Sequence, residues 1–351
     1  MFGGEMSGTW VRERHQAADR FAKDAEYAVQ VARWAPSVHN TQPWRFGIGD
    51  RRISVRGDAE RRLEVADPTG RQMLISCGAA IFTLVLALRW RGYAPRVRLL
   101  PDPDRPQLLA EVTLDEPAGG AAEASEETGR LLGQVRLRCT HRGPFLPMRL
   151  PAGLLLLLRE EVRREGGALH VVTGEHAVGA LAALTRAAEH LQQLDPAYDA
   201  EVMRWAPAPG SSRPDGVHAG SYPREDEPTE PHFAARDFAR GQGWGTPSDS
   251  EAGSGRLTVG TVAVLTTRSD GPEDWLRAGR ALQRMLLRAQ AEGGVSAAFH
   301  TQPLEIPELR EVIRSRLCGG EHPQMLLRLG MAESERTTVR RPPDEVIDED
   351  R

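Results

Sequence analysis

The sequence is poor in cysteine and almost without lysine. Its three cysteines, Cys77, Cys139 and Cys318, lie far apart and form no CxxC spacing, so neither a structural zinc site nor a disulfide framework is expected. Lys23 is the only lysine among 45 basic residues, so a positively charged binding site must use the planar, forked guanidinium of arginine. The net charge of −4 gives no indication of a nucleic-acid partner.

Long apolar runs and the common catalytic motifs are also absent. The longest apolar run, 79–87, is too short to span a membrane, and Met1–Trp10 lacks the apolar segment of a signal peptide. We therefore expect a cytoplasmic protein with no membrane partner. No HExxH, GxSxG, Walker or GxGxxG pattern occurs, which disfavours zinc hydrolysis, an α/β-hydrolase nucleophile, P-loop chemistry and a Rossmann dinucleotide site.

The most informative stretch is Ala35–Trp44, which follows an apolar helical run and precedes a short strand. Each of its two prolines lacks an N–H group and restricts the residue before it, so a helix cannot continue through this segment. A loop fixed by rigid elements on both sides is typical of ligand-contacting groups. The alternative is a helix-to-strand connection in which Trp44 fills a core, and residue chemistry alone supports both interpretations equally.

The pattern of apolar residues predicts alternating helices and strands, and hence a mixed α+β fold. A long helix at 71–90 is apolar on nearly all sides, which predicts a central, buried position. We expect Asp67 to cap this helix, with Pro68 at its first position. The other helices are predicted at 19–34, 151–164, 174–194, 275–292 and 306–317. Strands are predicted at 45–49, 52–56, 96–100, 107–114, 168–172, 257–266 and 324–329.

Two sequence echoes indicate an internal duplication. The Gly-Arg pair at Gly70 recurs at Gly279 in a second buried helix, and a Pro-Gln pair precedes both the strand at 107–114 and the strand at 324–329. We expect two tandem α/β halves that pack their long helices together as an intramolecular pseudo-dimer. The predicted parts are a first half at 1–116, a linker at 117–127 and a second half at 128–351.

The stretch from about 206 to 255 differs from the rest of the second half. It is rich in Gly, Pro, Ser and Asp and shows no periodic pattern, although Phe233, Phe238 and Trp244 interrupt it. A long segment of this kind is a lid, a binding loop or a disordered insertion. The aromatic residues favour a lid that packs on another part of the protein.

A short arginine motif and two histidines are candidates for chemistry. Arg138, Thr140 and Arg142 alternate along the chain, and three such donors can converge on one phosphate. The alternative is a solvated basic stretch in an arginine-rich protein. His300 and His39 lie on turns, where a histidine is more often a structural hydrogen-bonding group than an acid or base.

The residues of the first loop and of the arginine motif resemble the FMN-dependent nitroreductase superfamily. The order of a helix, Ala-Pro-Ser-x-His-Asn-Thr-Gln-Pro-Trp-Arg-Phe and a strand is similar to that family's loop that contacts the flavin ring. Arg138-x-Thr140-x-Arg142 looks like its Arg-x-Ser/Thr-x-Lys/Arg motif, which holds the FMN phosphate. Because each motif occurs in one half only, the chain resembles the fused, single-chain (Acg-like) branch of actinobacteria. This implies a nitroreductase-like fold with one FMN site between the halves, as a monomer or weak homodimer.

The resemblance implies three groups of FMN contacts. The loop at 37–42 contacts the ring, the turn at 299–302 brings backbone groups toward its reactive N5 edge, and the arginine motif binds the phosphate with added charge from the C-terminal tail. Gln72 and Ser76 are only loosely placed, and no catalytic side chain or metal ligand is implied. The cofactor-binding residues implied in this way are Ser37, Val38, His39, Asn40, Gln42, Gln72, Ser76, Arg138, Thr140, Arg142, Phe299, His300, Thr301, Gln302, Arg340 and Arg341.

The activity implied is electron transfer from NAD(P)H through FMN to a small acceptor such as a nitroaromatic or a quinone. Two alternatives stay open, because fold does not fix function. The chain could store or sequester FMN, with Phe238 or Trp244 of the 206–255 segment in the place of the acceptor and little turnover. It could instead be a flavin-dependent dehydrogenase of a biosynthetic intermediate.

Overall fold

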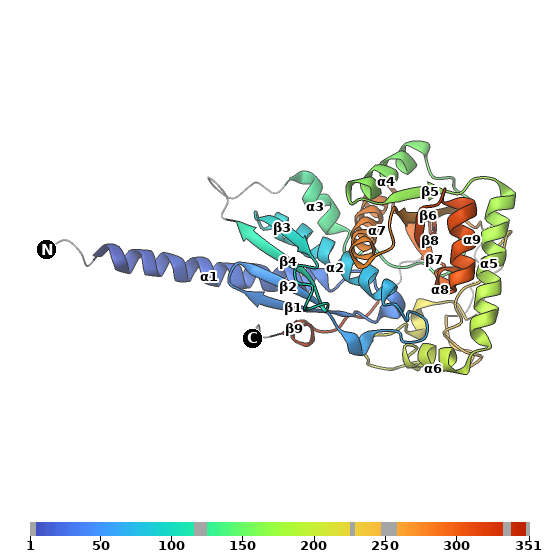
Figure 1. The fold of residues 1–351 in the computed structure, drawn as a ribbon, viewed down its shortest axis with the longest axis horizontal. Coiled ribbons are helices and arrows are strands. Elements are labelled where there is room, and N and C mark those ends of the chain that lie inside the picture. The colour runs from blue at the N-terminus through green and yellow to red at the C-terminus, as the bar shows by residue number, and fades with distance from the viewer. Residues whose placement is uncertain (1–4, 116–124, 225–228, 247–257, 333–337, 349–351) are drawn as a thin grey trace.

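Two β-sheets, each packed against its own helices, make up the molecule (Figure 1). A computed structural model describes residues 5–115, 125–224, 229–246, 258–332 and 338–348. The strands of the first sheet, in the order β3-β4-β2-β1-β9, are β3 (Ala94–Leu99), β4 (Leu108–Asp115), β2 (Arg52–Gly57), β1 (Trp44–Gly49) and β9 (Ile347–Asp348). Those of the second, in the order β5-β6-β8-β7, are β5 (Ala168–Val171), β6 (Thr261–Thr267), β8 (His322–Gly330) and β7 (Ser296–Phe299).

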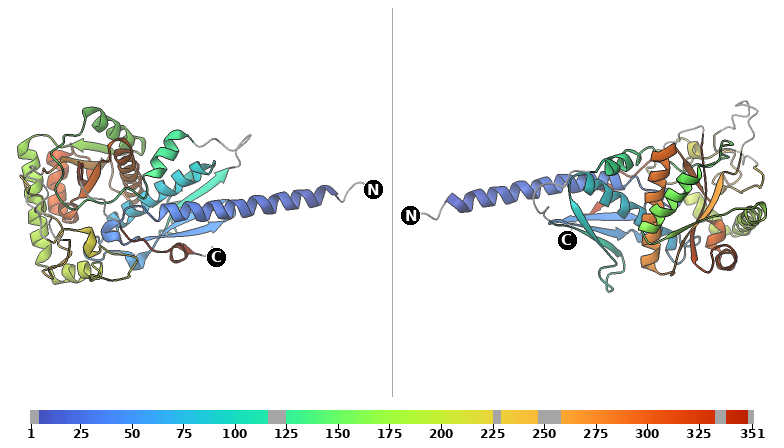
Figure 2. Two further views of the ribbon diagram at one scale, coloured as in Figure 1. Left: turned by 180° about the vertical axis from the view of Figure 1, so that it is seen from behind. Right: turned by 90° about the horizontal axis from the view of Figure 1, so that it is seen from above.

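The helices confirm the α+β class that the sequence predicts. The long ones are α1 (Glu5–Ala32), α2 (Arg71–Trp90), α4 (Ala152–Arg164), α5 (Glu175–Gln193), α7 (Pro272–Gly293) and α9 (Pro307–Leu317). The shorter ones are α3 (Glu126–Gly133), α6 (Pro196–Arg204), α8 (Gln302–Glu305) and the 3₁₀ turns η1 (Val38–Asn40), η2 (Ala59–Arg61), η3 (Ala219–Ser221) and η4 (Pro343–Glu345). The N-terminal part of α1 extends away from the rest of the chain (Figures 1 and 2).

The two sheets share one strand order. In the first sheet the first four strands lie in the order β3-β4-β2-β1, and in the second sheet, read from its other edge, the corresponding order is β7-β8-β6-β5. Every neighbouring pair among these eight strands is antiparallel. The long 206–255 segment falls between the first and second strands of the second sheet, after α5 and α6. This shared order supports the predicted duplication into halves, which stays a prediction.

The helices α2 and α7 cross at a pair of glycines. A Cβ atom on Gly78 would overlap the carbonyl oxygen of Leu276, and one on Gly279 would overlap the carbonyl oxygen of Ile75. Only glycine therefore permits this approach of the two backbones. In the structure Gly279 packs against Gly78, whereas the repeated Gly-Arg pair in the sequence matches Gly279 with Gly70.

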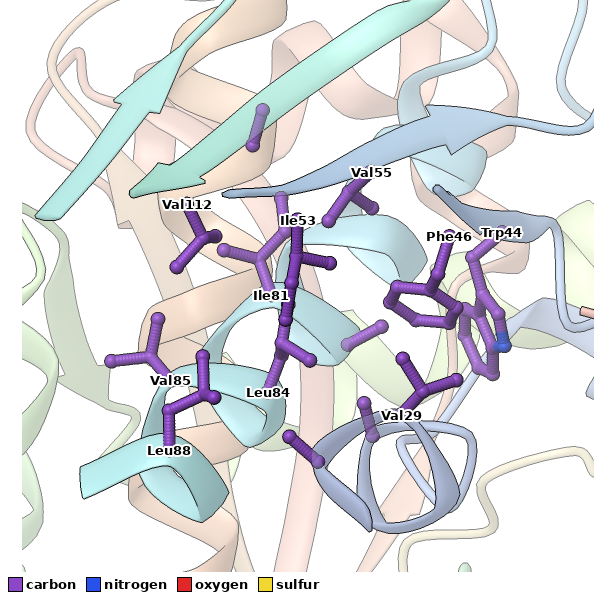
Figure 3. Close-up of a cluster of buried hydrophobic side chains, with 14 of the residues drawn as sticks. Val29, Trp44, Phe46, Ile53, Val55, Ile81, Leu84, Val85, Leu88 and Val112 are labelled. Atoms are coloured by element: carbon purple, nitrogen blue, oxygen red, sulfur yellow. The ribbon is translucent and has the colours of Figure 1, made fainter. Parts of the chain in front are cut away.

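The first core lies between α2, α1 and the first sheet, as Figure 3 shows. Trp44 and Phe46 of β1 are fully buried there, against Val29 of α1. By length and composition α2 could cross a membrane, but 83% of its apolar stretch is buried inside the protein, so it is the predicted central core helix. Trp44 thus fills a core, which is what the interpretation of the Ala35–Trp44 loop as a helix-to-strand connection predicts.

Several boundaries differ from those predicted. The N-cap of α2 is Gly70, at a left-handed φ of 75°, and not Asp67; the Asp67 carboxylate instead accepts a hydrogen bond from the Met73 amide at 2.9 Å. The first helix begins at Glu5 rather than Asp19. The sequence pattern missed β7, β9, α3 and α6, which are short. Of the predicted linker, residues 117–124 lie outside the described residues, and Ser125 caps α3.

The C-terminal tail returns to the first sheet. β9 pairs in parallel with β1, and the Phe46 amide donates to the carbonyl oxygen of Val346 at 2.8 Å. This connection brings the residues just before it, Arg340 and Arg341, beside the Ala35–Trp44 loop, more than 290 positions away in the sequence.

Candidate functional site

A cavity of about 1050 Å³, its open mouth included, lies between the Ala35–Trp44 loop, α2 and the second sheet. The loop and α2 contribute Pro36, Ser37, Val38, His39, Gln72, Ile75 and Ser76. The rest of the lining is Thr140, His141, Arg142, Gly143, Pro144, Thr229, Phe233, Ala235, Arg236, Phe238, Leu282, Ala298, Phe299, His300, Thr301, Met325 and Arg328.

The loop that borders the cavity has an unusual backbone. His39, Asn40 and Gln42 all have left-handed φ angles, of 45°, 54° and 50°, which residues other than glycine adopt at a cost. Asn40 Nδ2 donates to the carbonyl oxygen of Gly216 at 3.0 Å, and the Gln42 side chain accepts from the Arg341 amide at 2.8 Å. The side chains of Asn40 and Gln42 therefore hold the loop in its shape and do not line the cavity.

Ser76 and Gln72 of α2 fix the other side of this loop. The Ser76 hydroxyl donates to the Gln72 carbonyl oxygen at 2.7 Å and accepts from the Val38 amide at 3.1 Å. The Ser37 hydroxyl accepts from the Gln42 amide at 3.0 Å. These bonds connect the loop to the central helix, so the cavity wall is rigid at this point.

His39 is buried in the cavity wall with no hydrogen-bond partner for either ring nitrogen among the described residues. Its ring lies edge-on to Phe238, with 5.3 Å between the centroids. Burial, and then the charge of Arg236, lowers the pKa of His39 to about 3. At neutral pH the imidazole is therefore uncharged, with one donor and one acceptor available to a ligand.

His300 has the opposite environment, because both of its nitrogens are used. Arg328 Nε donates to His300 Nε2 at 2.8 Å, so Nδ1 carries the proton and donates to the Ala234 carbonyl oxygen at 3.2 Å. Burial, followed by the charge of Arg328, lowers the pKa of His300 well below its usual value. These contacts make His300 a structural hydrogen-bonding group, as expected for most histidines of this kind.

Three arginines gather beside the loop with incomplete hydrogen bonding. The Nε atoms of Arg33, Arg138 and Arg340 are buried and have no hydrogen-bond partner among the described residues. Burial lowers the pKa of Arg138 to about 10, and burial with the charges of Arg138 and Arg33 lowers that of Arg340 to about 9. Repelling cations with unused donors are a suitable environment for an anion. Thr140, two residues after Arg138, lines the cavity itself.

Arg341 does not belong to this cluster. Its guanidinium donates to the carbonyl oxygens of Gln42 at 3.3 Å and Glu345 at 2.6 Å, and lies 3.7 Å from the Asp58 carboxylate. Arg341 thus holds the tail against the loop, while Arg340 joins the buried arginines. The sequence alone leaves open which of the two adds charge at the site.

The structure brings most of the predicted site residues to the cavity but not all of them. Those that line it are Ser37, Val38, His39, Gln72, Ser76, Thr140, Arg142, Phe299, His300 and Thr301. Those that do not are Asn40, Gln42, Arg138, Gln302, Arg340 and Arg341. Arg138 lies two residues before Thr140 of the lining, and Arg340 Nη2 donates to the Ala35 carbonyl oxygen at 3.3 Å, next to Pro36 of the lining. Gln302 Nε2 donates to Glu189 at 3.3 Å.

Sequence reasoning missed Arg236, which lines the cavity from the 206–255 segment. Its Nη2 donates to the fully buried Glu305 carboxylate at 2.7 Å. Nearby, Phe233 packs against His300 with 5.2 Å between the ring centroids. In the sequence, only the aromatic residues of the otherwise polar 206–255 segment indicated that it forms part of a wall. Nothing in the sequence indicated a role for Arg236, because its partner Glu305 is 69 positions away.

Two of the relatives found by comparison with known proteins are 31% identical and span nearly the whole chain. The protein of Mycobacterium tuberculosis (strain H37Rv) provisionally named NAD(P)H nitroreductase Rv3131 is 31% identical over 315 residues, which cover 89% of this chain and 86% of the relative. The provisionally named NAD(P)H nitroreductase acg of the same strain is 31% identical over 328 residues, 91% of this chain and 94% of the relative. No protein-family model matches the chain.

Among solved structures, a nitroreductase with bound FMN from Bacteroides fragilis is similar at 12% identity and a TM-score of 0.36, over 60% of this chain and 94% of that one. This TM-score is too low to support an argument from the structure, so the assignment depends on the two mycobacterial relatives and their coverage of the chain. The chain therefore belongs to the nitroreductase family.

Proposed function

We propose that this chain is an FMN-dependent oxidoreductase that passes electrons from NAD(P)H to a small acceptor, such as a nitroaromatic or a quinone. The observation that carries the proposal is the cluster of buried arginines with unused donors, Arg33, Arg138 and Arg340, beside the Ala35–Trp44 loop that borders the cavity. The names of the mycobacterial relatives, NAD(P)H nitroreductase, agree with it.

The donor set fits the phosphate of FMN. Arg138 and Arg340 repel each other while buried, and a phosphate between them would supply the missing charge and accept their free N–H groups. Thr140 adds a hydroxyl, and Arg142, which donates to the Ser221 carbonyl oxygen at 3.1 Å, adds a further charge. These four residues would hold the phosphate.

The isoalloxazine ring would lie along the loop at 36–39 and the turn at 299–301. When bound, FMN supplies the redox chemistry by accepting a hydride and passing electrons to the acceptor. The protein's contribution is to orient the ring with fixed donors and acceptors, among them the neutral imidazole of His39. Phe233 and Phe238 keep water away from the cavity on the side of the 206–255 segment.

A second function, sequestration of FMN with little turnover, is favoured by how firmly this segment is held. Arg236 pairs with Glu305, the Asp237 amide donates to Glu189 at 3.1 Å, and the Ala234 carbonyl oxygen accepts from His300. A wall with this many buried contacts opens rarely. It would limit the access of NAD(P)H and of an acceptor to the flavin.

Flavin absorbance tests the cofactor. We expect the purified protein to take up FMN and to lose this capacity in an Arg138→Ala/Arg142→Ala double variant. The control is Arg163→Ala/Arg314→Ala, which removes two arginines from exposed ion pairs with Glu160 and Glu311. A wild-type protein that takes up no FMN, or a double variant that binds it normally, would refute the proposal.

Anaerobic mixing with NADH or NADPH separates the two functions. Rapid bleaching of the flavin supports the oxidoreductase. Slow bleaching that becomes rapid in Phe238→Ala, which opens the wall beside His39, supports sequestration instead.

A further inference from the structure

The lining of the cavity carries charge of one sign, and Glu305, which pairs with Arg236, lies outside that lining. The lining includes Arg142, Arg236 and Arg328, and among the described lining residues there is no aspartate or glutamate. Such a cavity favours an anionic ligand, because burial strengthens electrostatic interactions. The question is which of the three guanidinium groups is available to the acceptor once FMN is bound.

Two of the three have other roles. Arg328 directs its donors into the wall, to His300 Nε2 at 2.8 Å, the Gly143 carbonyl oxygen at 3.2 Å and the Val259 carbonyl oxygen at 3.3 Å. Arg142 belongs to the motif proposed to bind the FMN phosphate. Arg236 comes from the 206–255 segment, outside both flavin motifs, and its ion pair with Glu305 accounts for only one side of its guanidinium.

Arg236 is held by one edge and leaves the other unused. Its Nη2 donates to Glu305 Oε1 at 2.7 Å, while its Nη1 is buried and has no hydrogen-bond partner among the described residues. Glu305 also accepts from Gln72 at 3.0 Å, Gln192 at 2.7 Å and Thr301 at 2.9 Å. A buried donor without a partner is rare and indicates a ligand position.

The surroundings of Arg236 are aromatic. Phe238, two residues on, and Phe233 both line the cavity, and Phe238 packs against His39. His39 interacts electrostatically with Arg236, so the two lie close together in the wall. A planar ring that carries an acidic group would place the ring on the aromatic side chains and the acid on the guanidinium.

We infer that the cavity takes a planar aromatic acceptor that carries a carboxylate, and that Arg236 binds this carboxylate. This inference rests on the proposed function, because it names the class of acceptor for the same site. Arg236 determines specificity here, and it acts as a binding group that Glu305 holds in place.

Binding of two redox-inert probes, benzoate and benzamide, tests the inference on the full chain equilibrated with FMN. The readout is the ratio of their dissociation constants by calorimetry, which cancels general effects of a variant on the fold. Wild type should prefer benzoate by about tenfold or more, as expected for a charge-assisted hydrogen bond. Arg236→Gln should abolish this preference, whereas Arg224→Gln, which changes an exposed arginine of the same segment, should keep it.

The variant Glu305→Gln distinguishes a binding role of Arg236 from a purely structural role. Removal of the negative charge behind Arg236 should strengthen benzoate binding relative to benzamide, so the two variants move the ratio in opposite directions. Equal binding of benzoate and benzamide by wild type, or an unchanged ratio in Arg236→Gln, would overturn the inference. Flavin absorbance before each titration reports FMN uptake, so a failure of the proposed function, in which no FMN binds, is distinguished from a failure of the inference, in which FMN binds and the ratio shows no preference.

Discussion

At the scale of single residues, the site consists of groups that the fold keeps in unusual states. His39 is buried, neutral and without a hydrogen-bond partner among the described residues, on a backbone that a histidine adopts at a cost. Arg138 and Arg340 are buried cations that repel each other. Such states persist only when the surrounding structure stabilises them, and they are typical of functional sites.

The neutral state of His39 predicts a pH dependence. Its folded pKa of about 3 lies below the unfolded value of about 6.5, so the unfolded chain binds more protons in between. The stability that His39 contributes is full above pH 6.5 and is lost toward pH 3, by up to about 1.4 kcal/mol per pH unit.

His39→Asn, which also tolerates a left-handed backbone, isolates this effect. In urea unfolding, the variant should gain up to about 2 kcal/mol relative to wild type between pH 6.5 and 5. The contributions of His300 and Asp67 cancel because both proteins contain them. A difference that stays constant over this range would mean that the folded protein protonates His39 normally.

Variants of Arg340 and of its neighbour Arg341 test the phosphate position, with Arg341 as the control. Arg340→Gln should weaken FMN binding by about tenfold or more, because it removes a charge-assisted donor from the proposed phosphate position. Arg341→Gln should mainly lower the melting temperature, since Arg341 binds Asp58 and Glu345. Fluorescence titration and thermal unfolding measure the two effects, and equal FMN affinities in both variants would contradict the role of Arg340.

At the scale of elements, the crossing of α2 and α7 sets the geometry of the site. The cavity takes Gln72, Ile75 and Ser76 from α2 and Leu282 from α7, so both helices must keep their positions. Gly78 and Gly279 permit their close contact, and Gln283 Nε2 donates to Thr83 Oγ1 across it at 3.0 Å. The site therefore depends on backbone packing as well as on its own side chains.

A methyl group at this crossing should be destabilising. Gly279→Ala should lower the free energy of unfolding by about 1–3 kcal/mol or more, because the Ile75 carbonyl oxygen occupies the position of the new Cβ. Gly179→Ala in α5, where a Cβ meets no atom within 4 Å, should be neutral or stabilising by up to about 1 kcal/mol. Urea unfolding of both variants checks this, and equal effects would show that the crossing can adjust.

The elements with a strong local pattern could be predicted from the sequence. The helix at 71–90 and the hairpin of β1 and β2 show periodicity and turn residues that depend on neighbours in the chain. The elements β7, β9 and α6 could not be predicted from the sequence, because contacts with residues far away in the chain determine whether a strand of two to four residues or a single short helix forms. The N-cap of α2 was predicted wrongly because Gly70 occupies that position, while Asp67, three residues earlier, accepts a hydrogen bond from the Met73 amide.

The site likewise has residues that could be predicted from the sequence and residues that could not. The loop at 37–42 and the Arg138 motif are each contiguous in the chain, so their residue types alone indicate a ligand. Arg236 was missed because its role depends on Glu305 and on an aromatic wall formed by a segment without periodicity. The choice between Arg340 and Arg341 depends on which way each side chain turns from the tail.

At the scale of the whole molecule, one chain builds one composite cavity. The loop at 36–39 and α2 form one side, the residues at 140–144 and the turn at 299–301 form another, and the C-terminal tail returns to the first sheet. A site completed within one chain predicts a fixed cofactor content that does not depend on association between chains.

The stoichiometry of FMN binding tests this account most directly. Apoprotein titrated with FMN, with the mass in solution measured by analytical ultracentrifugation, should bind one FMN per chain, both as a monomer at low concentration and at high concentration. Arg138→Ala/Arg142→Ala should bind none under the same conditions. No uptake, two FMN per chain, or uptake only when two chains associate would contradict a single site built between the halves of one chain.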